Sequence, residues 1–441
     1  MAGMPAAVPP AGPAGIPPDT QFVPAEPVEN WSANWLGYSR YDGIIVTADD
    51  LKAMAPAIRT ALWQYVETGG SLLVVGPADL SGLSGWAKEQ KGGWTIVWSG
   101  FGRCFVSPDD NLDKWDSAHL TMLGGSWVQT ADPWRSANSW QGRSSSDAND
   151  KFPVVEDIGI PIKGLFLLMV LFVLAIGPVN LLVLARKKRR IWMLWTTPVI
   201  SLVTCLAVFG YMLVSEGWQG HLRTETLTLL DQSSRRATTL GWTAFYSPLT
   251  PGDGLHFSYD TEVVSQRRNE GQRAGVRSCT IDWSQDQHFA SGWVEARVPA
   301  HFKVRKSEVR RERVTVHREP DQRLSMVNGL GAEVRRFWYV DEKNQIYTAA
   351  QVAPGARAIL QAENKGVPPV QAHALRQIFV NENWLSPIQD MTAHPERRLK
   401  PRSYLAELDD SPFLEDALRN ARTRNCHALV LGMLREDDER E

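Results

Sequence analysis

Residues 177–200, GPVNLLVLARKKRRIWMLWTTPVI, place five consecutive basic residues between two stretches that carry no charge. The uncharged stretches cover 22 residues at 164–185 and 24 residues at 191–214. A helix rises 1.5 Å per residue, so about 20 apolar residues cross a hydrocarbon layer of roughly 30 Å. Buried helices of a soluble domain are the alternative, but such helices seldom lack charge over this length. The sequence therefore predicts a transmembrane hairpin at residues 161–215.

The basic loop of the hairpin predicts its orientation. Short loops rich in Lys and Arg stay on the cytoplasmic side of a membrane. The outer flanks instead carry Glu156, Asp157 and Glu216, with only Lys163 near the bilayer. Both large flanking regions are therefore expected outside the cytoplasm, although the same charges could also bind anionic lipid or a partner. The residues expected to set the topology are Arg186, Lys187, Lys188, Arg189 and Arg190.

Polar residues inside the hairpin predict how its helices pack. Pro178 leaves the carbonyl of Leu174 without its helical donor, so we expect a kink there. In an antiparallel pair, Asn180 lies at the depth of Thr196 and Thr197, and a hydrogen bond between them would contribute roughly 0.6 kcal/mol. Three tryptophans fall where interfacial aromatic side chains are expected, namely Trp192, Trp195 and Trp218.

The length and charge of the chain restrict the remaining possibilities. A chain of 441 residues exceeds one usual hydrophobic core, so two or three domains are expected. The net charge of −2 gives no overall basic field, which argues against a nucleic-acid partner. Residues 1–30 are rich in Pro, Ala and Gly and are predicted to be a disordered linker. They contain no signal peptide, so we expect that an upstream signal or spanning helix is missing.

Residues 41–76, YDGIIVTADDLKAMAPAIRTALWQYVETGGSLLVVG, have the pattern of a βαβ unit. A short buried strand at 43–46 precedes a helix that has Pro56 in its first turn. Gly69 can end that helix, and the continuous apolar run at 71–75 is typical of a strand inside a parallel sheet. Further strands are predicted at 94–99 and 104–107.

The segments YDGIIVT and YVETGGSLLVVG resemble the class I glutamine amidotransferase-like fold, especially its catalytically empty forms on bacterial membrane proteins. The resemblance implies a flavodoxin-like α/β domain at 31–150, incomplete at its N-terminus. Active members carry a Cys on a strand-to-helix elbow between glycines, followed by a His and a Glu. Here Gly102-Arg103-Cys104-Phe105 lacks the second glycine, and His119 has no acidic partner at a family-like spacing. Cys104 is therefore expected to be a strand residue; a hydrolase or amidotransferase-like enzyme using Cys104 is the alternative.

From Leu222 onward the hydrophobic pattern changes to period two, as in the alternating residues of 240–246. Residues 334–352 predict a β-hairpin turning near 341–344, followed by a turn at Pro354 and a further strand. Short alternating strands favour a mainly β, sandwich-like domain. Within this domain, assigned to 221–434, we expect a helix at 372–379, a strand at 403–408 and an apolar run at 427–434, followed by a charged, solvated tail at 435–441.

No catalytic or cofactor-binding motif is apparent in the sequence, so no enzyme activity, cofactor or metal is predicted. Asp286, Gln287 and His288 could hold a metal with a distant third ligand, but a polar loop is favoured. The run at 306–313, KSEVRRER, is expected to be a solvated strand face and not a nucleic-acid patch. The 18 tryptophans are expected mainly in the core, or else on a glycan or partner surface.

The α/β segment, the hairpin and the β-rich tail together resemble a family of uncharacterised bacterial integral membrane proteins. This resemblance implies the inner (cytoplasmic) membrane of a bacterium. We therefore expect a non-catalytic envelope protein whose two extracytoplasmic domains bind or scaffold a protein partner or a cell-wall glycan. An accessory subunit of an ABC export system is an alternative with the same chemistry and a different partner.

Overall fold

The computed structural model describes residues 26–41, 43–83, 87–91, 93–110, 148–150, 152–154, 162–187, 190–216, 220–265, 278–363, 399–419, 421, 423–435 and 439–440. Several predicted features lie outside these residues. They are most of the linker, Glu156, Asp157, Trp218, His119, Lys188, Arg189 and the helix expected at 372–379.

The first folded unit, here called the N-terminal unit (residues 26–110), contains the predicted βαβ arrangement. Strands β1 and β2 are parallel neighbours, and every residue of β2 is buried. Pro56 begins helix α2, and Gly69 just after it has a φ of 115°, which glycine adopts most readily. The sheet has the order β1-β2-β5-β4-β3 and is mixed, because β4 is antiparallel to both β5 and β3. The elements are η1 Val28–Asn30, η2 Trp35–Gly37, β1 Gly43–Thr47, α1 Ala48–Ala53, α2 Pro56–Glu67, β2 Ser71–Val75, β3 Ala87–Lys91, β4 Trp94–Ser99 and β5 Gly102–Val106.

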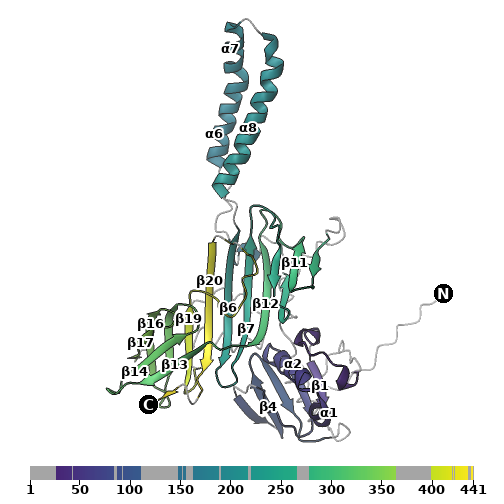
Figure 1. The fold of residues 1–441 in the computed structure, drawn as a ribbon, viewed down its shortest axis with the longest axis vertical. Helices are drawn as coiled ribbons and strands as arrows, with labels where there is room; N and C mark the ends of the chain where they lie inside the picture. Colours follow the sequence, from purple (N-terminus) through teal and green to yellow (C-terminus); the bar gives the residue numbers. More distant parts are fainter. Residues whose placement is uncertain are drawn as a thin grey trace, which may run out of the picture.

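Two long apolar helical segments form the predicted hairpin. They lie side by side and stand away from the sheets, with their connecting turn at the far end (Figure 1). Both are long and apolar enough to cross a membrane, by length and composition. The elements are α6 Ile162–Leu174, the π-helical turn η7 Ala175–Val179, α7 Asn180–Arg186, the short 3-10 turn η8 Arg190–Trp192 and α8 Met193–Glu216.

The part of the chain after the hairpin, here called the β unit (described residues from 220 onward), is built on one nine-stranded sheet. Its order is β18-β16-β15-β19-β20-β6-β7-β12-β9. All neighbours are antiparallel except β20 and β6, which are parallel and come from opposite ends of the unit. The strands are β6 His221–Asp231, β7 Arg236–Tyr246, β9 Thr261–Ser265, β12 Ala300–Val309, β15 Val334–Val340, β16 Ile346–Val352, β18 Gln361–Glu363, β19 Ser403–Leu408 and β20 Thr423–Met433.

Two smaller sheets pack on one face of the nine-stranded sheet. Their core residues, such as Phe257 and Met326, meet side chains from alternate positions of the long strands, such as Phe302 and Phe337. The β-rich prediction is confirmed, but the unit is one long sheet with two partial covers and not two sheets of similar size. The small sheets contain β8 Leu255–Phe257, β10 Thr280–Asp282 and β11 Gln287–Ser291, and β13 Arg313–Arg318, β14 Leu324–Gly329, β17 Arg357–Ile359 and β21 Glu439–Arg440.

Hydrogen bonds and positive φ values in the turns explain where the predicted strands end. The hairpin of β15 and β16 turns at Asp341, whose carbonyl accepts from the Asn344 N–H at 3.1 Å. Asn344 and Gly355 both have positive φ values, 60° and 74°, as tight turns require. The end of the chain, predicted to be a solvated tail, includes the two residues of β21, which pair with β13.

Candidate functional site: the apolar hairpin and the domain junction

The hairpin exposes its apolar side chains. Phe166 on α6 and Leu202 and Leu206 on α8 each expose more than half of their surface, at 68%, 62% and 61%. Only 11% of the most apolar stretch of the first segment is buried, and none of that of the second. A core helix of a soluble protein would instead bury one face. The exposed apolar surface and the length of both segments are therefore compatible with helices that span a membrane.

Asn180 and Thr196 meet inside the hairpin. The Thr196 hydroxyl donates to Asn180 Oδ1 at 3.0 Å, and the Asn180 side chain is buried between the helices. Thr197, the other candidate partner, is half-buried. The bond joins the two segments at one depth, as expected for an antiparallel pair.

Pro178 lies in the π-helical turn Ala175–Val179. Proline has no N–H to donate, and the wider turn absorbs this defect: the N–H of Asn180 bonds to the carbonyls of Ala175 and Gly177. The irregularity expected at Pro178 is thus a π turn, which lets the helix continue to Arg186.

The basic residues lie at the turn of the hairpin. Arg186 and Lys187 are exposed at the end of the first segment, and Arg190 begins η8. Lys188 and Arg189 lie outside the described residues. Trp192 and Trp195 expose 56% and 77% of their surfaces just beyond the turn, a position typical of interfacial aromatic residues.

At the opposite side of the molecule, a buried ion pair joins the N-terminal unit to the β unit. Glu67, at the end of α2, has 1% of its side chain exposed. Its Oε2 accepts hydrogen bonds from Arg236 Nε at 3.0 Å, from Arg236 Nη2 at 2.7 Å and from the Ser307 hydroxyl at 2.7 Å. Arg236 begins β7 and Ser307 lies on β12, so one carboxylate holds two strands of the long sheet.

A second set of contacts extends the same junction. The fully buried Arg305 of β12 pairs with Glu262 and donates to the Thr68 carbonyl at 3.2 Å. The Trp35 indole donates to the Asp260 carbonyl at 2.7 Å. Desolvated charged hydrogen bonds of this kind are stronger and more directional than surface pairs. The Arg305–Thr68 and Trp35–Asp260 hydrogen bonds therefore extend the junction between the two units.

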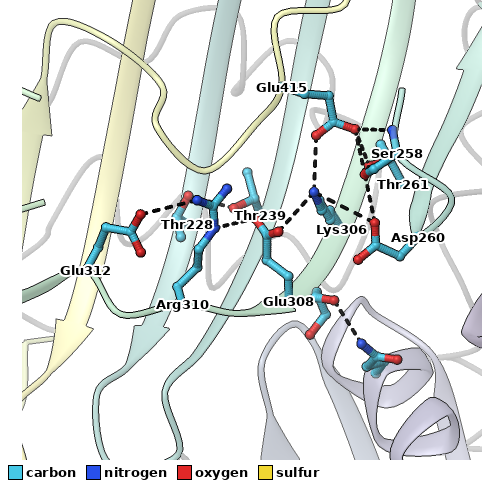
Figure 2. A network of polar contacts seen from close by, with 12 residues as sticks. Thr228, Thr239, Ser258, Asp260, Thr261, Lys306, Glu308, Arg310, Glu312 and Glu415 are labelled. Carbon is cyan, nitrogen blue, oxygen red and sulfur yellow. Dashed lines mark hydrogen bonds and ion pairs between the residues drawn. The ribbon is translucent and has the colours of Figure 1, made fainter. Parts of the chain in front are cut away.

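Lys306 lies at the centre of a third polar network (Figure 2). Its ammonium contacts Glu308 at 3.0 Å, Glu415 at 3.2 Å and Asp260 at 3.7 Å. Burial favours the neutral amine, but these carboxylates outweigh it and raise the pKa of Lys306. The solvated face predicted for 306–313 is therefore wrong at Lys306 and Ser307, which are buried because acidic partners from other segments cover them.

Cys104 lies in the middle of β5, between β2 and β4, and is fully buried. Burial raises the pKa of its thiol to about 12, which keeps it protonated at neutral pH. No strand-to-helix elbow forms at Cys104, because β5 continues to Val106. These features disfavour a nucleophilic role.

The Asp286-Gln287-His288 segment divides between two faces. Gln287 is buried, and its amide donates to the carbonyls of Ser258 and Thr261 at 2.5 Å and 2.6 Å. Asp286 and His288 instead lie near His256 on the other face. The sequence predicted only that a third ligand would have to come from a distant segment. The structure shows that His256 lies next to Asp286 and His288.

Several residues of the junction were not predicted from the sequence. Glu67 and Arg236 are 169 positions apart, and no local pattern pairs them. A charged residue directly after the buried face of an amphipathic helix, as in Tyr65-Val66-Glu67, is the one signal that could have singled out Glu67. Similarly, His256 between Leu255 and Phe257 has the alternation of a strand with one polar face.

No family model matches the chain, and no curated protein matches it. The described residues show a mixed sheet with two helices, two apolar helices and a β-rich region.

Proposed function

We propose that this chain is a non-catalytic bacterial envelope protein, anchored in the inner membrane by its two-helix hairpin. Its N-terminal unit and β unit lie on the extracytoplasmic side, where they bind or scaffold a protein partner or a cell-wall glycan. The resemblance to bacterial integral membrane proteins with an amidotransferase-like domain is part of this proposal.

The observation that carries the proposal is the apolar surface of the hairpin. Two neighbouring helices expose large apolar side chains around their circumference, and a bilayer is the environment that covers such a surface. The Asn180–Thr196 bond supports the same conclusion, because the polar side chains face each other and not the surroundings.

The orientation rests on the charges of the turn. Arg186, Lys187 and Arg190 belong to a basic loop of the kind that remains cytoplasmic. Because the helices lead back from this loop toward the sheets, a cytoplasmic loop places both folded units on the opposite side of the membrane (Figure 1).

The junction supports a scaffolding role. The Glu67–Arg236 pair and the hydrogen bond from Arg305 to the Thr68 carbonyl join the two units through buried charged groups, which favour one relative orientation. A body of fixed shape next to the membrane presents its surfaces to a partner at a defined height and angle. A catalytic role finds less support, because the thiol of Cys104 is buried and protonated.

A native cysteine provides the test of topology. Cys279, on the β unit, is exposed, whereas Cys104 and Cys426 are buried. In intact spheroplasts a membrane-impermeant maleimide should label the full chain at Cys279, and Cys279→Ser should abolish the label. In the Cys279→Ser background, Lys187→Cys should be labelled only after the membrane is permeabilised.

The reverse pattern would overturn the proposed orientation. If Lys187→Cys were labelled in intact spheroplasts and Cys279 only after permeabilisation, both folded units would lie in the cytoplasm. Cys426 serves as the folding control, since it should react only after denaturation.

Partner binding requires a separate measurement on the purified full chain in detergent. Retention on purified cell-wall glycan, or crosslinking to envelope proteins in cells, is expected. Capture of ABC transporter subunits would specify an export accessory role. If the protein converted a substrate and showed neither form of binding, the scaffold proposal would be wrong and an enzymatic function would be favoured.

A further inference from the structure

Two histidines face each other on a small sheet of the β unit. His256 of β8 and His288 of β11 are direct partners in the antiparallel register, and their rings stack with centroids 4.3 Å apart at 6°. Leu255, Phe257 and Phe289, their sequence neighbours, point into the core. Because side chains alternate along a strand, burial of these neighbours fixes both imidazoles on the other face.

The turn before β8 brings a carboxylate to this pair. Asp253 Oδ1 lies 3.4 Å from His256 Nε2. His288 Nε2 donates to the Asp253 carbonyl oxygen at 2.9 Å, so Nδ1 is the nitrogen of His288 that can bind a metal. Gly254 allows the close approach, since its φ is 61° and a Cβ there would lie 2.3 Å from the Phe289 carbonyl oxygen. One potential ligand atom from each of Asp253, His256 and His288 lies within 4.8 Å of the others.

Asp286 determines which nitrogen of His256 carries the hydrogen. Its Oδ2 lies 2.8 Å from His256 Nδ1, and a carboxylate only accepts, so in the neutral imidazole Nδ1 donates and the lone pair is on Nε2. Among the described residues this buried Nε2 has no hydrogen-bond partner. Two acceptors, Nε2 and Asp253 Oδ1, therefore face each other at 3.4 Å. A cation between them would turn this repulsion into attraction.

We infer that Asp253, His256 and His288 form a binding site for a divalent transition metal ion such as Zn²⁺. Tetrahedral ligands about 2.1 Å from zinc lie about 3.4 Å from one another, which matches the distance between Asp253 Oδ1 and His256 Nε2. Imidazole nitrogen and carboxylate oxygen are the usual zinc ligands, and a carboxylate behind a ligating histidine, here Asp286, orients the ring. The ion ties the turn to both strands and keeps one position open for water or another ligand.

Arg419 competes with the ion for the carboxylates. Its Nη1 lies 3.6 Å from Asp253 Oδ2 and its Nη2 lies 4.0 Å from Asp286 Oδ2. The Arg419 side chain is 58% exposed, so it is free to turn into solvent when a metal binds. Removal of this positive charge should strengthen metal binding, which a merely structural role of Arg419 does not predict.

The test uses the purified full chain in detergent, stripped with a chelator and titrated with Co²⁺ and then Zn²⁺. One Co²⁺ per chain should bind with visible d–d absorption, and Zn²⁺ should displace it. His256→Asn and His288→Asn should weaken binding by more than about 100-fold, and Asp286→Asn by about 10–100-fold. Arg419→Ala should tighten it. His317→Asn, on β13 of another sheet, is the matched control and should bind as the wild type does.

The inference is overturned if the wild-type chain binds no stoichiometric Co²⁺, or if the two histidine variants bind it unchanged. Asp253→Asn covers the case in which a histidine variant misfolds, because the Asp253 side chain is 62% exposed. Its near-ultraviolet circular dichroism should match the wild type while its affinity falls at least about tenfold; unchanged affinity there also rejects the site. The result does not depend on membrane orientation, so it is separate from the outcome of cysteine labelling.

Discussion

Arg236→Met should destabilise the junction strongly. The substitution keeps the length of the side chain and removes the charge that faces Glu67, whose side chain is 1% exposed. The carboxylate loses both hydrogen bonds from the guanidinium, at 3.0 Å and 2.7 Å, and keeps the Ser307 hydroxyl. Removal of one partner of a buried pair leaves an uncompensated charge and costs about 3–5 kcal/mol.

Thermal unfolding of the full chain in detergent, followed by tryptophan fluorescence, measures the effect. For a unit of 150–250 residues each kcal/mol shifts the Tm by about 2–4 °C, so we expect a fall of about 6–20 °C. Arg235→Met makes the same chemical change at the neighbouring exposed position of the turn and should shift the Tm little.

A double variant separates two contributions to the lost stability: the loss of the ion-pair attraction and the cost of a buried charge that has no partner. Glu67→Leu combined with Arg236→Met removes both charges, so it should recover most of the stability lost in Arg236→Met. The reasoning is refuted if Arg236→Met melts together with Arg235→Met. It is equally refuted if the double variant is no more stable than Arg236→Met alone.

Three other features give predictions of their own. Leu202 is 62% exposed within α8, so Leu202→Arg should oppose membrane integration by about 2.5–3.5 kcal/mol. The control Leu249→Arg, on the β unit, should not affect integration. Equal resistance of the two variants to carbonate extraction would contradict a spanning helix. Burial lowers the pKa of His301 to about 4, so the unfolded chain binds a proton below about pH 6.5 that the folded chain does not. Stability should therefore fall by about 3 kcal/mol from pH 6.5 to 4, and His301→Phe should remove this part of the pH dependence in urea unfolding; an unchanged slope would be evidence against it. A Cβ on Gly102 would lie 2.0 Å from the Val66 carbonyl oxygen, so Gly102→Ala should destabilise the N-terminal unit by about 1–3 kcal/mol. Amide hydrogen exchange in β5 should then be faster than in the wild type. Unchanged protection of the β5 amides would be evidence against this close packing.

The elements of the N-terminal unit follow closely from local sequence. Short apolar runs, a proline at a helix start and Gly69, which has a positive φ, place β1, α2 and β2 within a residue or two. The start of the central strand β5 was harder to anticipate, since the predicted strand at 104–107 begins two residues earlier, at Gly102. Glycine gives no hydrophobic signal, so the sequence pattern missed this start.

Some contacts of the candidate sites could be predicted from the sequence, and others could not. The hairpin, with Asn180 and Thr196 at one depth, could be placed from helical geometry alone, because both segments follow one another in the chain. The Glu67–Arg236 pair and the His256–His288 pair could not, since each joins segments that meet only when distant strands and helices pack.

The sequence by itself determined the positions of many strands and helices, though not of α1 or β3, and which two helices are apolar enough to cross a membrane. These properties depend on neighbours within a few residues, through periodicity, turn conformations and uninterrupted apolar length. Only the tertiary structure decided that β20 lies parallel to β6, that Lys306 is buried among carboxylates and that Asp253 reaches two histidines. These contacts depend on register and packing between distant segments, and a one-residue shift in register would turn the same side chains to the opposite face.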